Sequence, residues 1–409
     1  MKKPTLWSRN FTLITLGTLM SATGGAAMNV ALGLVVFDNT SSPWMTGLYE
    51  ALSLLPAVIL PVLLAPALDR YPRKRIVVGL DFLQGLLYLL FGVYVLTRGF
   101  QYGAYLLFGV LTGAIGSVDS TAYSAFYPDL IPEGFLEKGY SVSSTIYPMV
   151  TLVTAPLAAL VYTRFGMPVL FFGEGALLLA ASALESFIRL RENHTREPKR
   201  FRLKEYAGEI AEGFGYLKEE KGVRSLYGYM SVTNGASAGS SLMVLAYFQT
   251  APGLTTALYS LLISAETLGR MLGGVVHYFL KIPAVRRFRV AASVYVTYDI
   301  LDAALLFLPY GGMLAARFLC GFLGVNSATL RESAIQHYLP SHMRARVNSL
   351  LSVAILALVM VMQLLAGALG EILPYRLVAV GMSLLAMVAL YLLVFRNRRP
   401  VRDLMNVDF

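Results

Sequence analysis

Charged side chains occur inside apolar stretches in the second half of the chain. Glu266 and Arg270 are four residues apart, and on a helix a glutamate followed by an arginine at this spacing favours an ion pair. Asp299 and Asp302 lie one helical turn apart, and Asp302 and Arg317 each fall about six residues, or roughly 9 Å, from the expected outer ends of their helices. We expect that Glu266 can pair with Arg270, and Asp302 with Arg317. For each carboxylate, a static ion pair and a role in proton coupling remain open alternatives.

In the first half, Asp119 has no cation near it in the sequence. It shares a helical face with Thr112, Gly116 and Tyr123. A buried carboxyl group without a neighbouring cation can hold and release a proton near neutral pH. We therefore predict that Asp119 is the principal proton-coupling residue, with Glu266 as a second candidate.

Polar side chains at helical spacing predict a surface that faces a cavity rather than lipid. Tyr147 and Thr151 belong to such a stripe. The predicted cavity or substrate residues are Asn29, Tyr123, Tyr147, Thr151, Asn234, Arg270, Arg317 and Gln363. The four histidines show no metal-ligand spacing, so we expect no metal site and no cofactor.

The composition indicates which elements must position these residues. The 409 residues are 56% hydrophobic and only 14% charged, against about 25% charged in an average soluble domain. So few charges cannot cover a soluble protein of this length, so the chain is predicted to be an integral membrane protein. Apolar stretches of about 20 residues or more predict twelve transmembrane helices, near 11–37, 46–68, 76–97, 103–127, 140–162, 168–189, 225–249, 254–280, 288–308, 311–336, 347–370 and 374–395.

Basic residues orient these helices in the membrane. Of the 34 Lys and Arg residues, 28 lie at the termini and the even-numbered connections, whereas Arg98, Arg164 and Arg376 lie on the opposite side. Basic residues accumulate on the cytoplasmic side, so both termini are predicted to be cytoplasmic. The net charge of +10 is then explained by topology and anionic lipid headgroups rather than by nucleic acid.

Weak internal repeats divide the chain into two halves. Ser21–Ala26 resembles Ser231–Ala236, and Thr46–Tyr49 resembles Thr256–Tyr259, each at an offset of 210 residues. The predicted fold is therefore an all-α membrane protein with two six-helix pseudo-repeat bundles. The predicted domains are a first bundle over 1–190, a cytoplasmic linker with an amphipathic helix over 191–222, and a second bundle over 223–409.

Several motifs carry a family resemblance. The segment Leu68–Arg75, LDRYPRKR, resembles the Asp-Arg-x-x-Arg-Lys motif that the major facilitator superfamily carries between its second and third helices. Tyr127–Pro132 and Arg344–Leu350 look like the drug:proton antiporter branch with macrolide-efflux, siderophore-exporter and lysophospholipid-transporter proteins. Thr154–Pro156 retains the proline of the exporter motif in the fifth helix but not its glycines.

The resemblance implies roles for particular residues. Helices 1, 4, 7 and 10 of that fold line a central cavity, and 2, 5, 8 and 11 flank it, which would expose Asp119, Glu266, Arg270 and Arg317 to water or substrate. Helices 6 and 9 are peripheral, so Glu174, Asp299 and Asp302 are expected to be structural, with Asp299 and Asp302 as candidates for structural ion pairs. The implied inner gate consists of Asp69, Arg70, Arg73 and Lys74, opposite Arg346.

The predicted function is secondary active transport by alternating access, with proton-coupled export of a small amphipathic compound that is drug-like or siderophore-like. The alternative is a lipid or lysophospholipid transporter or flippase of the same fold. The sequence contains no G-x-x-x-x-G-K-[ST] or H-E-x-x-H pattern, which disfavours a primary pump or a metal-dependent intramembrane enzyme. We expect a monomer in the plasma (inner) membrane whose partners are substrate, protons and lipids.

Overall fold

The chain is built from helices in every part that the structure describes. The structure is a computed structural model, and it describes residues 5–68, 71–190, 203–279 and 282–407. The α-helices are α1 (Arg9–Thr40), α2 (Pro43–Leu68), α3 (Arg73–Arg98), α4 (Tyr102–Phe126), α5 (Leu136–Phe165), α6 (Met167–Ser186), α7 (Leu203–Glu219), α8 (Lys221–Thr250), α9 (Thr256–Phe279), α10 (Ala284–Ala304), α11 (Tyr310–Tyr338), α12 (Ser341–Gly370), α13 (Tyr375–Ala389) and α14 (Arg398–Met405). Short 3₁₀ segments, η1 (Tyr127–Leu130) and η2 (Leu305–Phe307), follow α4 and α10, and a π-helical segment, η3 (Leu390–Phe395), follows α13.

Ten helices within the described residues are long and apolar enough to cross a membrane. The remaining two predicted spans are occupied by α8 and α9, which have 30 and 24 residues. Their length suffices to cross the hydrocarbon, but polar side chains such as Asn234, Glu266 and Arg270 interrupt their apolar character. Glu266 and Arg270 of α9 belong to the charged network described below, and Asn234 of α8 lines the cavity beside it.

Two compact units make up the molecule. The first contains Met1–Asn39 and Leu52–Arg200, and the second contains Thr40–Ala51 and Phe201–Phe409. The start of α2 belongs to the second unit, in which it packs against α12. In that contact Gln363 Nε2 donates a hydrogen bond of 2.7 Å to Glu50, and a Cβ at Gly47 would lie 2.6 Å from the Gln363 carbonyl oxygen.

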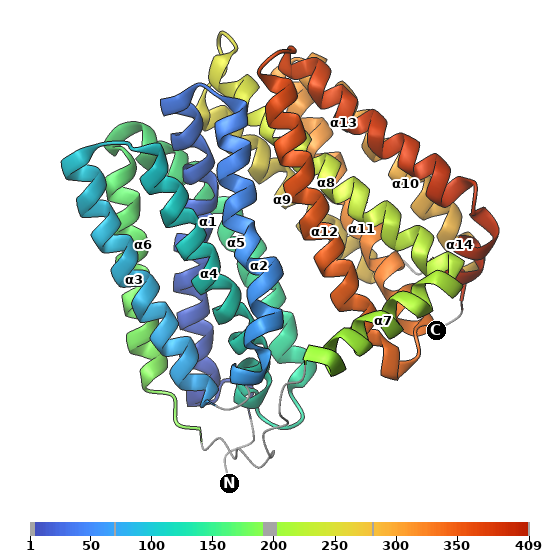
Figure 1. Cartoon of the computed structure of the whole chain (residues 1–409), viewed down its shortest axis with the longest axis horizontal. Coiled ribbons are helices and arrows are strands. Elements are labelled where there is room, and N and C mark those ends of the chain that lie inside the picture. The colour runs from blue at the N-terminus through green and yellow to red at the C-terminus, as the bar shows by residue number, and fades with distance from the viewer. Residues whose placement is uncertain (1–4, 69–70, 191–202, 280–281, 408–409) are drawn as a thin grey trace. The chain divides into compact units, whose positions relative to one another are not determined.

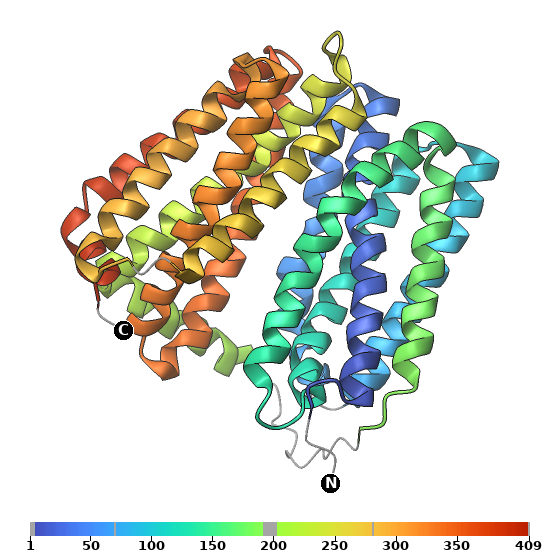
Figure 2. The ribbon, with the colours of Figure 1, turned by 180° about the vertical axis from the view of Figure 1, so that it is seen from behind.

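Within the first unit, α3 and α6 pack along their lengths, as Figures 1 and 2 show from two sides. Glycine permits this close approach: a Cβ at Gly175 would lie 2.7 Å from the Leu89 side chain. Phe91 stacks on Phe108 with ring centroids 4.1 Å apart, and Phe171 meets Phe91 edge-on at 5.1 Å. Aromatic packing and small residues thus hold α3, α4 and α6 together.

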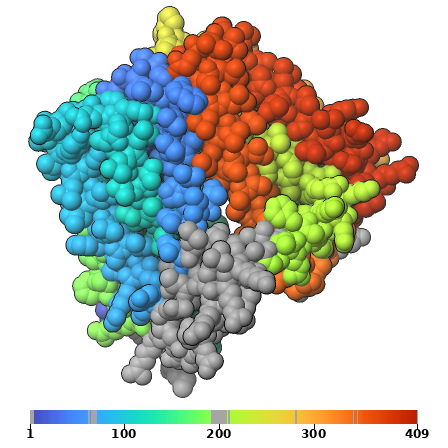
Figure 3. All heavy atoms as spheres, in the orientation of Figure 1, coloured from blue at the N-terminus to red at the C-terminus, as the bar shows by residue number. Residues whose placement is uncertain are grey.

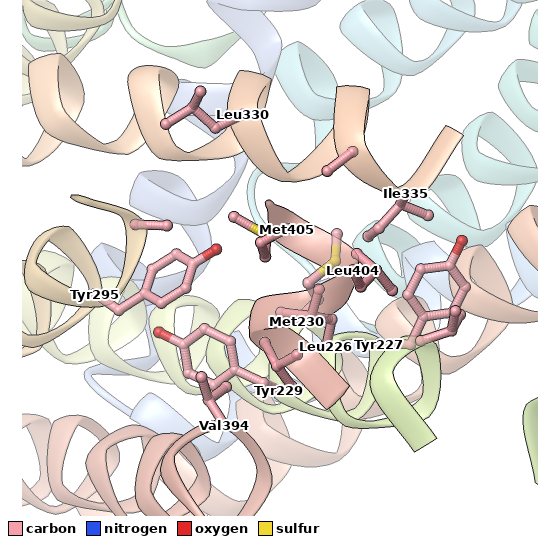
Figure 4. Packing of buried hydrophobic residues seen from close by; sticks show 14 of the residues in the cluster. Leu226, Tyr227, Tyr229, Met230, Tyr295, Leu330, Ile335, Val394, Leu404 and Met405 are labelled. Carbon is pink, nitrogen blue, oxygen red and sulfur yellow. The ribbon is translucent and has the colours of Figure 1, made fainter. Parts of the chain in front are cut away.

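Within the second unit, α9 packs against α11 and α8 against α12. An apolar core at one end of this unit joins α8, α10, α11 and α14, and Figure 4 shows its members, including Leu226, Met230, Leu330 and Met405. Figure 3 shows α7 on the surface of this unit next to α12, with which it is in contact. The apolar core fixes the helices whose polar faces form the candidate site.

Candidate functional site

Arg317 is the centre of a buried ion network in the second unit. Its side chain is only 6% exposed, and its Nη1 lies 3.4 Å from Glu266 Oε2 and 3.3 Å from Asp302 Oδ1. Arg270 Nη2 approaches the other Glu266 oxygen at 2.5 Å. One glutamate therefore binds two arginines, and one arginine joins helices α9 and α10 to α11.

Close backbone packing between α9 and α11 makes this network possible. A Cβ at Gly321 would collide with the Glu266 carbonyl oxygen, and a Cβ at Gly269 would collide with the Phe318 carbonyl oxygen. Only glycine allows the two backbones to approach this closely. The approach brings Glu266 within reach of Arg317 on the neighbouring helix.

A cavity of about 300 Å³ borders this network within the second unit. Its walls come from α8, α9, α10 and α11, and they include Asn234, Arg270 and Arg331. Two of the predicted cavity residues, Asn234 and Arg270, thus line one cavity. Arg317, also predicted to face a cavity, is not among the residues that line this one, and its guanidinium pairs with Glu266 and Asp302.

Asp119 lies in a cluster of carboxyl groups in the first unit. Asp81 on α3 and Glu185 on α6 are 6% and 2% exposed, and their carboxyl groups hydrogen-bond to each other. Such a bond requires that one of the two carboxyl groups carries a proton. Both groups interact electrostatically with Asp119. Asp119 Oδ1 and Glu185 Oε2 are buried without a hydrogen-bond partner in the described residues.

Helix α1 closes over this carboxyl cluster with small residues. A Cβ at Gly17 would collide with the Glu185 carboxylate, and a Cβ at Gly24 would collide with that of Glu174. Thr18 on the same helix shares a hydrogen bond of 2.6 Å with the Tyr123 hydroxyl. No ion pair between Asp81, Asp119 or Glu185 and a basic side chain occurs among the residues described. The cluster can therefore store protons rather than compensate charge with cations.

Sequence reasoning missed Asp81 and Glu185, because neither has a cation at helical pairing distance in its own predicted span except Arg189 at the span end. The rule that an ionisable residue inside a span needs a physical reason applies equally to them and could have found them. Asp81 meets Glu185 because α3 packs against α6, and Asp119 of α4 lies near them because α3 also packs against α4. Sequence spacing reveals neither contact. Asp119 is partly buried, and although it has no cation near it in the sequence, it interacts with the Asp81 and Glu185 carboxyl groups.

The other predicted polar residues do not converge on one place. Asn29 is exposed, and the Tyr147 side chain is 51% exposed. Thr151 donates to the Tyr147 carbonyl one turn earlier, at 2.8 Å. Gln363 binds Glu50, which supplies the partner that Glu50 lacks in its own stretch. Asp299 is 2% exposed, and its Oδ2 has no hydrogen-bond partner in the described ranges.

The predicted gate residues are described in part. Asp69 and Arg70 lie outside the described residues. Arg73 Nη1 donates to the Ala125 carbonyl at 2.8 Å and lies 3.3 Å from Asp129 Oδ2, and Lys74 Nζ donates to the Ser186 carbonyl at 2.7 Å. These contacts join the start of α3 to the ends of α4 and α6.

Arg346, at the start of α12, lies in the second unit. It forms an ion pair of 2.6 Å with Glu212 of α7. Nearby, Asn348 accepts hydrogen bonds from the Tyr227 hydroxyl at 2.9 Å and from Gln336 Nε2 at 3.0 Å. The role of these residues in a gate remains a prediction.

Known proteins resemble this chain over most of its length. Macrolide efflux protein A of Streptococcus pyogenes is 23% identical over 339 residues, which cover 80% of each chain. Among solved structures, the nucleoside transporter NupG matches with a TM-score of 0.71 at 11% identity, covering 94% of this chain and 98% of its own.

Two further structures show the same fold. A bacterial homologue of the human lysosomal transporter Spinster matches with a TM-score of 0.67 at 14% identity, covering 98% of both chains. A bacterial homologue of the iron transporter ferroportin matches with a TM-score of 0.66 at 17% identity, covering 93% of this chain and 97% of its own. The family model of the Major Facilitator Superfamily matches residues 14–298. The predicted fold is thus confirmed, and the chain belongs to the Major Facilitator Superfamily of multi-pass membrane transporters.

Proposed function

We propose that this transporter exports a small amphipathic compound in exchange for protons, by alternating access. The carboxyl cluster of Asp81, Asp119 and Glu185 is the observation that carries the proposal. Ionised carboxylates are costly to bury without a cation, whereas protonated ones are not. A bundle that opens and closes over such a cluster would couple its protonation to its conformation.

Different tasks for the two charged clusters are part of the proposal. In the second unit, Glu266 and Asp302 already have arginine partners, so their charges are compensated. Glu266 is therefore a weaker candidate for proton coupling than Asp119, which interacts with the Asp81 and Glu185 carboxyl groups and the Tyr123 hydroxyl and forms no ion pair among the described residues. Proton exchange is assigned to the first unit and substrate contact to the second.

Other observations support the proposed direction of transport and the proposed orientation in the membrane. Similarity to a macrolide efflux protein supports export. The 28 basic residues on one side of the predicted spans support an orientation with both termini in the cytoplasm of a cell with a plasma (inner) membrane.

Inverted membrane vesicles test the coupling. Uptake of radiolabelled erythromycin, rhodamine 6G and 1-pyrenebutyrate is measured with an imposed proton gradient and after the gradient is dissipated. We expect gradient-driven uptake of at least one compound, and we expect its loss in Asp119→Asn. Glu137→Gln is the matched control, because Glu137 lies in the same unit but is exposed in the first turn of α5.

Two results would contradict the proposal. Uptake that is unchanged when the gradient is dissipated would favour passive movement, as in a lipid or lysophospholipid flippase. Unchanged coupling in Asp119→Asn, Asp81→Asn and Glu185→Gln would remove the carboxyl cluster from the mechanism.

A further inference from the structure

Two arginine side chains contribute to the wall of the cavity in the second unit. Arg331 of α11 lines it, and the Nε atom of this arginine is buried without a hydrogen-bond partner in the described part of the chain. Its Nη1 lies 3.4 Å from the Tyr295 hydroxyl, and its guanidinium lies 6.0 Å from the centroid of that ring. A guanidinium group has five N–H donors, so most of the binding capacity of Arg331 is unused.

Arg270 supplies a second cation to the same cavity. Its side chain is 61% exposed, and its carboxylate partner Glu266 is shared with Arg317. Glu266 and Asp302 together balance the charges of Arg270 and Arg317. Asp299 is the other carboxylate of α10, but it does not line the cavity and forms no ion pair with Arg331 among the described residues. Among the described residues that line the cavity, two are arginines and none is a carboxylate.

The remaining walls combine aromatic and apolar side chains with the small polar side chains of Thr233, Asn234, Ser237 and Ser327. The rings of Tyr229 and Tyr295 lie side by side in Figure 4, with centroids 4.9 Å apart, and both line the cavity with Tyr298 and Val325. A volume of about 300 Å³ lies at the lower end of the range for small-molecule sites. The cavity thus combines two arginine side chains with aromatic and apolar side chains that can contact an apolar or aromatic group.

We propose that this cavity binds the acidic group of an amphipathic substrate, a carboxylate or a phosphate, between Arg270 and Arg331. Guanidinium groups bind both anions through paired N–H···O contacts. The substrate class is therefore an amphipathic acid with an apolar body. This inference rests on the proposed function for its transport role, but binding itself requires no proton gradient.

Binding of three probes with a common body tests the charge preference. The purified full-length chain in a nonionic detergent is titrated with 1-pyrenebutyrate, 1-pyrenebutanol and trimethyl(4-pyren-1-ylbutyl)ammonium, and pyrene anisotropy is recorded. We expect the anion to bind most tightly. Arg331→Gln and Arg270→Gln should each weaken anion binding by about ten- to hundredfold, the range expected for hydrogen bonds to a charged group, and should change binding of the alcohol little.

A matched variant and two competitors complete the experiment. Arg402→Gln removes an exposed arginine of the same unit, paired with Asp403 and remote from the cavity lining, and should bind all three probes as the wild type does. Arg270→Gln, with its half-exposed side chain, keeps the test valid if Arg331→Gln fails to fold. Displacement of pyrenebutyrate by decanoate or by lysophosphatidylglycerol supports the proposal and distinguishes a free fatty acid from a phospholipid-derived acid.

Equal binding of the three probes by the wild type would overturn the proposal. An equal loss of anion binding in Arg402→Gln, or displacement by neither competitor, would overturn it as well. Anion-selective binding without proton-driven uptake would instead refute the proposed function and leave the binding site intact. Proton-driven uptake of rhodamine 6G, without any preference for the anionic probe in binding, would support the proposed function and refute the anion-binding site.

Discussion

Removing Arg317 should destabilise the second unit far more than removing Arg270, although Arg270 makes the shorter contact. The Arg317 side chain is 6% exposed and bridges Glu266 and Asp302, whereas the Arg270 side chain is 61% exposed. Breaking a buried ion pair by removing one partner costs about 3–5 kcal/mol, whereas an exposed pair contributes about 0.2–1 kcal/mol. We expect losses of unfolding free energy in these two ranges for Arg317→Gln and Arg270→Gln.

Equilibrium unfolding in mixtures of SDS and a nonionic detergent, followed by circular dichroism, measures both losses. The double variant Arg317→Gln/Asp302→Asn should recover about 0.5–3 kcal/mol relative to the sum of the single variants, as residues in one network do. Equal losses for the two arginines would refute the assignment of Arg317 as the centre of the network. Strict additivity with Asp302→Asn would refute their pairing.

Three further predictions concern helix packing and the gate. Gly17→Ala should cost about 1–3 kcal/mol of stability by forcing α1 away from Glu185, whereas Gly25→Ala, whose Cβ would meet nothing within 4 Å, should be nearly neutral in thermal unfolding. Gly321→Ala should separate α9 from α11 and destabilise the protein more than Gly324→Ala, where the nearest atom is 3.8 Å away. Asp69→Asn should speed cytoplasmic labelling of a probe cysteine near Asn348 in a Cys320→Ala background. A gate contact that contributes up to ~2 kcal/mol gives a rate increase of several-fold to about thirtyfold. An unchanged labelling rate would leave Asp69 a role in topology alone.

Helices and local ion pairs were predictable because they depend on short-range sequence spacing. Hydropathy located the spans, and the four-residue spacing of Glu266 and Arg270 corresponds to their contact in the structure. The pairing of Asp302 with Arg317 followed from their similar distances to the expected helix ends. These features need only the geometry of a single helix or the depth of the membrane.

Contacts between helices distant in sequence were not predictable. The carboxyl cluster joins Asp81, Asp119 and Glu185 from three helices, and no periodicity relates them. Similarly, the unpaired donors of Arg331 become apparent only when α10 and α11 define a common cavity. Which helices are neighbours, and which faces they share, depends on glycine contacts such as that of Gly321 with α9.

Proton movement during transport tests the central claim most directly. Proteoliposomes that enclose a pH-sensitive dye receive a transported compound on one side, with no proton gradient imposed. If the protein exchanges protons for the compound, the lumenal pH changes as protons move opposite to the compound, and Asp119→Asn abolishes this change. Movement of the compound through the wild-type protein without any change in lumenal pH would contradict the account.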